Sequence, residues 1–226
     1  MLAIIKKELK SYLLSPIGYI FIGLFLLIFS VFFMVTIFTS RVINFEYLFY
    51  NGATILTFVT PILTMRMFAE ERKNGTEQLL LTSPRGITSI VLGKFLAAGI
   101  IILITEALTF MYFIILDYFG NPSLLVALST LFGFFLLSLA YISFGMFASS
   151  ITENQIVASV ITIGAFMAIW FLPNLLPILD VFSLITKFEN FPTGLISVSE
   201  IITFVSFAVL FILLTIIILQ RRKSVK

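Results

Sequence analysis

Residues 201–219 read IITFVSFAVLFILLTIIIL, and Gln220-Arg221-Arg222-Lys223 follows them directly. The stretch holds no charged side chain and does not alternate strictly between apolar and polar residues. As an α-helix rising about 1.5 Å per residue, it would be long enough to cross the ~30 Å of hydrocarbon in a lipid bilayer. The sequence therefore predicts a membrane-spanning helix that ends at a basic cluster.

The composition of the whole chain agrees with a membrane protein. Of 226 residues, 60% are hydrophobic, only 11% are charged and 27 are Phe. One globular core of this size could not bury so much apolar surface, so lipid must cover part of it. The net charge of +3 is too small to indicate a nucleic-acid partner and is better explained by anionic lipid head groups.

Two absent residue types exclude most enzyme classes. The chain has no Cys and no His, which excludes disulfides, thiolate metal sites, cysteine nucleophiles and the commonest acid–base residue. No metal site, catalytic residue or cofactor is predicted in this chain. The nearest approach to an ATP-binding P-loop, from Gly86 to Gly93-Lys94-Phe95, has the wrong glycine spacing and lacks the Ser or Thr after Lys. We therefore do not expect the chain to hydrolyse ATP by itself.

Five further stretches are long and apolar enough to cross a bilayer. With the first they give six predicted spans: 17–38, 47–65, 95–116, 124–148, 156–176 and 201–219. Only helices and closed barrels satisfy their backbone groups in lipid, and these runs lack the alternation of barrel strands. The predicted fold class is an all-α polytopic membrane protein that forms one domain over residues 1–226.

The basic residues predict which side each connection faces. Twelve of the 14 Lys and Arg lie before the first span, between the second and third spans, or after the sixth. Short loops rich in Lys and Arg stay in the cytoplasm. Both termini and residues 66–94 are therefore predicted to be cytoplasmic, with Arg41–Glu46 and Asp180–Ser199 outside.

The first 16 residues predict a helix that lies in the cytoplasmic membrane interface. Leu2, Ile5, Leu9 and Tyr12 recur at steps of three and four residues, with the three lysines at positions 6, 7 and 10 off that stripe. Pro16 should separate this helix from the first span. A cleaved signal peptide is the alternative, but no short apolar region with a small-residue cleavage site precedes the long first span.

The 66–94 connection has an ordered pattern in residues 70–84, EERKNGTEQLLLTSP. Gly75 can end one helical turn, Thr76 can cap the next, and Leu79–Leu81 give that short helix an apolar face. A solvated loop is the alternative, which accounts for Arg72 and Lys73 but not for the order of the other residues. A short amphipathic helix in the cytosol favours a groove on a partner.

Three motifs resemble the ABC-2 type permeases, the membrane subunits of ATP-binding-cassette transporters. The motifs are EERKNGT followed by LLLTSP at 70–84, GMFASSITENQ at 145–155, and FENFPTG at 188–194 ahead of the last span. With six spans in order, the resemblance covers essentially the whole chain. It is nearest to the short permeases of gliding motility and nitrous-oxide-reductase maturation. The acid after Gly-Thr is displaced here to Glu77, and only Glu200 remains of the charged residues that relatives carry around 193–200.

The resemblance implies an ATPase-coupling role for the loop after the second span. The residues that it assigns to this role are Glu70, Glu71, Arg72, Gly75, Thr76, Glu77, Leu79, Leu80 and Leu81. The leucines would enter a cleft of the ATPase, and Glu71, Arg72 and Glu77 could form ion pairs at its rim. A second cytoplasmic contact is expected at Thr152, Glu153, Asn154 and Gln155. The alternative for that turn is structural, with Thr152 capping the fifth span.

Glu106 is the one acid placed well inside an apolar span. An ionised side chain at a helix centre costs about 2.5–3.5 kcal/mol on insertion scales. Glu106 could therefore belong to a translocation route or a subunit interface. Alternatively, it is a neutral acid hydrogen-bonded to Ser or Thr on a neighbouring helix, for example to the counterparts of Thr105 and Thr109 across a packed pair of helices.

Residues 177–200 form an apolar connection interrupted by Pro177 and Pro192. Such a segment can dip into the outer leaflet as short broken helices if protein satisfies its backbone. The resemblance implies outer re-entrant helices at this place. A simple amphipathic outer loop is the alternative.

The resemblance implies a permease subunit of an ABC transporter, not itself an enzyme, in a prokaryotic plasma or inner membrane. Its expected partners are two copies of a nucleotide-binding ATPase that hold ATP and Mg, a second permease subunit in a homo- or heterodimer, membrane lipids and an accessory extracytoplasmic protein. Export is the expected direction. An intramembrane lipid-modifying enzyme would need a cluster of acids around Glu106, and a passive channel would need no helix for an ATPase. These two classes are the alternatives.

Overall fold

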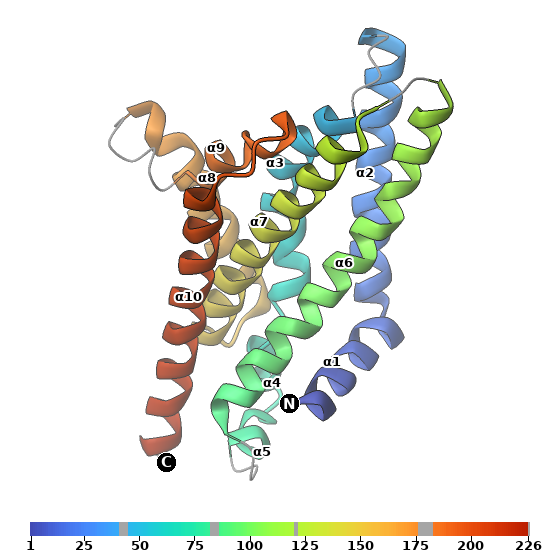
Figure 1. Cartoon of the computed structure of the whole chain (residues 1–226). Coiled ribbons are helices and arrows are strands. Elements are labelled where there is room, and N and C mark those ends of the chain that lie inside the picture. The colour runs from blue at the N-terminus through green and yellow to red at the C-terminus, as the bar shows by residue number, and fades with distance from the viewer. Residues whose placement is uncertain (41–44, 82–85, 120–121, 176–182, 226) are drawn as a thin grey trace.

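The computed structural model describes residues 1–40, 45–81, 86–119, 122–175 and 183–225. Within these ranges the chain forms helices only, and most of them run the length of one elongated bundle (Figure 1). Five helices are long and apolar enough to cross a membrane: α2 (Pro16–Ser40), α3 (Phe45–Thr64), α6 (Ile87–Phe119), α7 (Leu124–Ile151) and α10 (Val198–Val225). The all-helical polytopic fold is therefore confirmed.

The fifth predicted span corresponds to α8 (Gln155–Leu175). Its apolar run within the described residues, Gln155–Phe171, is shorter than the other five helices, and residue 176 lies outside the described residues. Six spans thus remain a prediction. The third span differs more: α6 starts at Ile87, not at Phe95, so the last eight residues of the predicted 66–94 loop are helical. Ile90 and Val91 are buried there, and Lys94 is accommodated by ion pairs.

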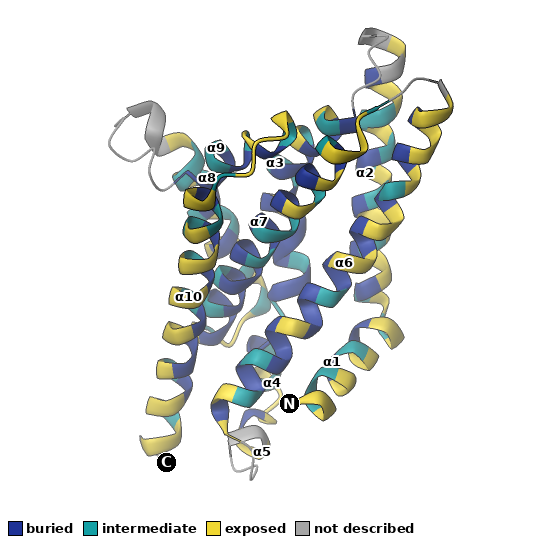
Figure 2. Ribbon diagram, viewed as in Figure 1, coloured by how far each residue is buried: buried dark blue, intermediate teal, exposed yellow. Residues whose placement is uncertain are grey.

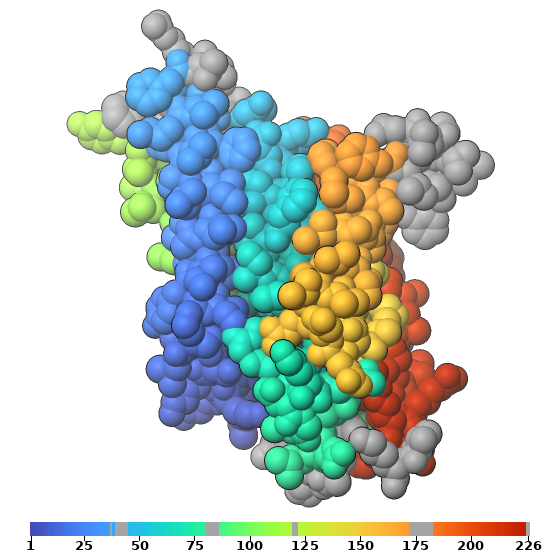
Figure 3. All heavy atoms as spheres, turned by 180° about the vertical axis from the view of Figure 1, so that it is seen from behind, coloured from blue at the N-terminus to red at the C-terminus, as the bar shows by residue number. Residues whose placement is uncertain are grey.

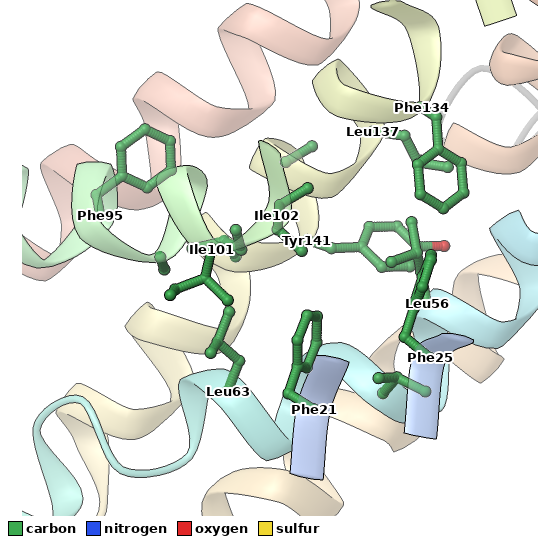
Figure 4. Close-up of a cluster of buried hydrophobic side chains, with 14 of the residues drawn as sticks. Phe21, Phe25, Leu56, Leu63, Phe95, Ile101, Ile102, Phe134, Leu137 and Tyr141 are labelled. Carbon is green, nitrogen blue, oxygen red and sulfur yellow. The ribbon is translucent and has the colours of Figure 1, made fainter. Parts of the chain in front are cut away.

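α7 lies at the centre of the bundle and contacts α3, α6, α8 and α10. Aromatic and aliphatic side chains from α2, α3, α6 and α7 fill the space around it (Figure 4). Phe134 on α7 meets Phe49 edge to face, with 5.0 Å between ring centroids, a favoured arrangement of two rings. The outward faces of α2, α6 and α10 remain exposed and apolar, as lipid contact requires (Figure 2).

The N-terminal helix α1 (Leu2–Leu14) ends where the sequence predicts. Ser15 is extended, with φ −94° and ψ 152°, and Pro16 begins α2. The predicted apolar stripe is only partly correct: Tyr12 is buried as predicted, but Leu2 is exposed and Glu8, which is not part of the stripe, is buried. α1 packs against α6 and α2, and Glu8 faces that contact because it pairs with a lysine of α6. Its place in the membrane interface stays a prediction.

Two short helices, α9 (Leu184–Phe188) and η2 (Phe191–Thr193), lie within the predicted re-entrant segment. Phe188 and Phe191 are fully buried, and the Ser129 hydroxyl of α7 donates to the Phe191 carbonyl at 2.9 Å. Part of this segment, residues 177–182, lies outside the described residues. The two helices lie at the end of the bundle opposite to both termini (Figure 1). Whether they sit in the outer leaflet stays a prediction.

Candidate functional site

The predicted coupling segment forms two short helices, α4 (Ala69–Lys73) and α5 (Glu77–Leu81). They lie at the same end of the bundle as both termini, and from behind they form the lower surface between α1 and α10 (Figures 1 and 3). Gly75 ends α4 as predicted: its φ of +71° is a left-handed conformation that favours glycine. The Thr76 hydroxyl donates to the Glu71 carbonyl at 3.1 Å, and its role as a cap of α5 stays a prediction.

Lys94 on α6 joins α1 and α4 through buried ion pairs. Its ammonium nitrogen lies 2.8 Å from a carboxylate oxygen of Glu71 and 3.2 Å from one of Glu8. Only 3% of the Lys94 side chain is exposed, and the Phe68 ring centroid is 5.4 Å from its nitrogen. The second Glu71 oxygen is buried without a hydrogen-bond partner among the described residues. Lys94 thereby links α1 and α4 to its own helix, α6, although the three segments lie far apart in the sequence.

Two arginines attach the coupling segment to the other side of the bundle. Arg72 pairs with Glu153 at 2.6 Å, and Arg222 at the end of α10 pairs with Glu77 at 3.0 Å. Both arginines also donate to the Ile151 carbonyl, at 3.1 Å from Arg72 and 3.4 Å from Arg222. Because each link joins a different element, α4 and α5 are tied to the α7–α8 turn and to α10.

These pairings change the expected use of the charged residues. Glu71, Arg72 and Glu77 are expected from the sequence to lie at the rim of a partner's cleft. In the structure all three form ion pairs within the chain, and Glu70 forms one with Arg66. Leu79 differs from them because 74% of its surface is exposed. The side chains of Leu80 and Leu81 lie outside the described residues.

Ser149 on α7 forms the joint between α3 and α4. Its hydroxyl oxygen accepts hydrogen bonds from the backbone N–H groups of Phe68 and Ala69, both at 3.1 Å, and donates to the Met65 carbonyl at 3.0 Å. Gly145, one turn earlier, faces α3, where a Cβ atom would lie 2.8 Å from the Thr64 Cβ. The glycine therefore permits the close approach that brings Ser149 to the joint.

The turn between α7 and α8 adjoins α4, as the Arg72–Glu153 pair shows. The expected cap is wrong in its residue: Asn154, not Thr152, accepts from the backbone N–H of Ile156, at 2.9 Å, and caps α8. Thr152 instead accepts from the Asn154 N–H at 3.1 Å. Asn154 takes this role because it is the residue directly before α8, which begins at Gln155.

A hollow of about 690 Å³ lies beside the coupling segment, between α1, α4 and α6. Charged and aromatic side chains from these helices line it, among them Glu8, Tyr12, Glu71 and Lys94, together with Leu79 of α5. The Tyr12 hydroxyl donates to the Leu63 carbonyl at 3.3 Å. Burial, with a smaller effect from Glu8, raises the pKa of Tyr12 far above its ordinary value, so this phenol stays protonated.

Glu106 lies in the middle of α6 and is 6% exposed. The hydroxyls of Thr105 and Thr109 bond to carbonyls of their own helix, those of Ile101 and Glu106. They do not bond to the Glu106 carboxyl group, one of whose oxygens is buried without a partner among the described residues. A hydrogen bond from a neighbouring helix to this Glu106 oxygen is therefore not seen among the described residues of one chain.

Sequence reasoning missed four residues of the site: Glu8, Lys94, Ser149 and Arg222. Lys94 and Arg222 count only toward the charge bias of their side of the membrane, and Ser149 is only one letter of a motif. Glu8 carried a signal, since it is the one acid among three lysines in a helix rich in apolar residues. The described residues hold no cluster of three acidic side chains placed to bind a metal ion.

A family model described as "ABC-2 family transporter protein" matches residues 38–219, which is most of the chain. The match includes α3 to α8 and most of α10, and therefore the whole coupling segment. Among curated proteins, no match was found.

Proposed function

The chain belongs to the ABC-2 family of transporter proteins, and we propose that it acts with two copies of a separate ATPase that grip α4 and α5. Membership makes it a membrane component of an ABC transporter, that is, a permease and not an enzyme. The motifs at 70–84, 145–155 and 188–194 support a place among the short permeases of gliding motility and nitrous-oxide-reductase maturation. ATP and Mg would be held by the partner.

The observation that carries the coupling role is the way in which α4 and α5 are fastened. Their charged residues are used within the chain, toward α6, the α7–α8 turn and α10. A short helix fixed at several points moves with the bundle as a rigid element. The exposed Leu79 and the hollow beside it provide an apolar contact and a concave surface for a partner.

The mechanism that we propose is conformational. ATP closes the pair of ATPase subunits, α4 and α5 follow them, and the connected helices shift between two arrangements. Two copies of the chain, or one copy and a related permease, would enclose the route. The 12-to-2 bias of basic residues supports a plasma-membrane protein with α4 and α5 in the cytoplasm. Export and an accessory outer protein rest on the resemblance.

The test is co-purification of the permease with its ATPase. Leu79→Asp puts a charge on a side chain that is largely exposed in the chain alone, so the fold should survive. In a partner's cleft that charge is desolvated and unpaired, a change that costs several kcal/mol. We expect at least a tenfold loss of bound ATPase and of substrate-stimulated ATP hydrolysis.

The matched control is Leu195→Asp. Leu195 is 66% exposed and lies just after η2, away from the coupling segment. This variant should keep the ATPase. Full retention of the ATPase and of stimulation by Leu79→Asp would refute the assignment of α4 and α5 as the coupling element.

A further inference from the structure

A groove on the surface of the bundle has no part in the proposed coupling role of α4 and α5. It lies between α6 and α7, has a volume of about 400 Å³, and is lined by Leu103, Glu106, Ala107, Phe110, Leu131, Phe132 and Phe135. Leu103 and Phe132 are 46% and 43% exposed, so the groove opens on the outer surface of the chain. Both helices are candidate membrane spans, and the opening therefore faces the hydrocarbon layer or another subunit within it.

Among the described residues that line this groove, Glu106 is the only one with an ionisable side chain. It is more than nine-tenths buried, and one carboxyl oxygen has no hydrogen-bond partner among the described residues. A buried polar atom without a partner is costly, and more so in hydrocarbon than in water. A ligand that carries a hydrogen-bond donor or a positive charge would therefore be stabilised in this groove.

The rest of the lining indicates which chemical class of ligand fits the groove. Three phenylalanines, Phe110, Phe132 and Phe135, line the groove with Glu106. Aromatic faces attract a cation within about 6 Å of the ring centroid, and more strongly where water is excluded. Aliphatic side chains supply the remaining walls, and the volume suits a small organic molecule. One carboxylate, several aromatic rings and apolar walls are together the chemistry that recognises an alkylammonium group on an apolar body.

We propose that this groove binds a cationic amphiphile from the bilayer, with its ammonium group on Glu106 and its apolar body along Phe110, Phe132 and Phe135. The amine would donate to the unpartnered carboxyl oxygen, and the carboxylate would be stabilised by the charge of the amine. The binding site belongs to the permease chain alone and does not depend on the coupling role of α4 and α5.

The experiment uses the purified full-length chain in nanodiscs of phosphatidylcholine, a lipid without net charge. Binding is measured by fluorescence anisotropy of a dansyl-labelled dodecylammonium probe and of the neutral dodecyl alcohol with the same label. Wild-type protein should bind the ammonium probe at least tenfold more tightly than the alcohol. Glu106→Gln, nearly the same in shape, should reduce that preference to less than threefold.

Ala107→Phe provides a second variant that leaves the carboxyl group in place. Ala107 lines the groove and is exposed, so a larger side chain should fill the groove and weaken both probes. Val209→Phe adds the same ring to an exposed site on α10 and should leave binding unchanged. Size-exclusion profiles establish that each variant is folded.

Three results would overturn the proposal. The first is equal affinity of wild type for the two probes, or no binding of either. The second is an unchanged preference in Glu106→Gln. The third is occupation of the groove by a second copy, seen as efficient disulfide dimerisation of Ala107→Cys in nanodiscs; the chain has no native cysteine to confuse this readout.

Discussion

Replacing Lys94 by methionine should destabilise the protein strongly. The substitution keeps an unbranched side chain but removes the cation that lies 2.8 Å from Glu71 and 3.2 Å from Glu8. Both carboxylates are largely buried, with side-chain exposures of 17% and 12%, so water replaces the lost partner poorly. Removing one member of a buried ion pair costs about 3–5 kcal/mol.

That loss corresponds to a roughly 150- to 5,000-fold change in the unfolding equilibrium constant. It can be measured as reversible unfolding in mixed micelles of a non-ionic detergent and SDS. Lys7→Met is the matched control, since its ammonium group is 3.7 Å from Glu8 and the side chain is 68% exposed. An exposed pair of this kind is worth about 0–1 kcal/mol.

A triple variant distinguishes lost charge balance from lost packing. Lys94→Met combined with Glu8→Gln and Glu71→Gln removes all three charges and should recover most of the stability lost in the single variant, because no buried carboxylate is left unpaired. The reasoning is wrong if Lys94→Met unfolds like Lys7→Met, or if the triple variant is no more stable than the single one.

Three further predictions concern the joint at α4 and the topology. Ser149→Ala should lower the free energy of unfolding by about 2–3 kcal/mol, because two buried backbone donors lose their acceptor. Ser150→Ala, whose hydroxyl donates to the Phe147 carbonyl of its own helix, should cost less than about 1 kcal/mol in the same SDS titration. Gly145→Ala should lower the melting temperature, with an overpacking cost of about 1–3 kcal/mol, whereas Gly23→Ala, with open space at its Cβ, should not; equal melting temperatures would contradict the close approach of α3 and α7. In intact cells, an impermeant maleimide should label a single cysteine at Lys187 but not at Asn74, and the opposite result would reverse the predicted topology.

The overall class of the fold could be predicted because lipid imposes a simple rule on sequence. Long apolar runs must become helices, and Gly75 and Pro16 mark helix ends through their own backbone restrictions. The start of α6 could not be predicted in this way. Lys94 reads as part of a solvated loop until its partners are known, and those partners lie 86 and 23 residues away in the chain.

The site was predicted as a segment but not as a set of contacts. Motif order placed residues 70–81 and 152–155 on one side of the membrane, and the Arg72–Glu153 pair brings the two segments together. Charge patterns fix the side on which Glu77 lies but not that its partner is Arg222, 145 residues later. Glu106 was identified from its insertion cost, whereas its missing partner becomes visible only when the neighbouring helices are in place.

The two arginines that share the Ile151 carbonyl have a mechanical consequence. They connect a helix from the first half of the chain to the last turns of α10, so a pull on α5 acts on the C-terminal helix directly as well as through the core. A force applied to the coupling segment would thereby be transmitted both to α10 and to the α7–α8 turn. An affinity tag fused just after Arg222 would therefore act directly on the Arg222–Glu77 ion pair that links α10 to α5.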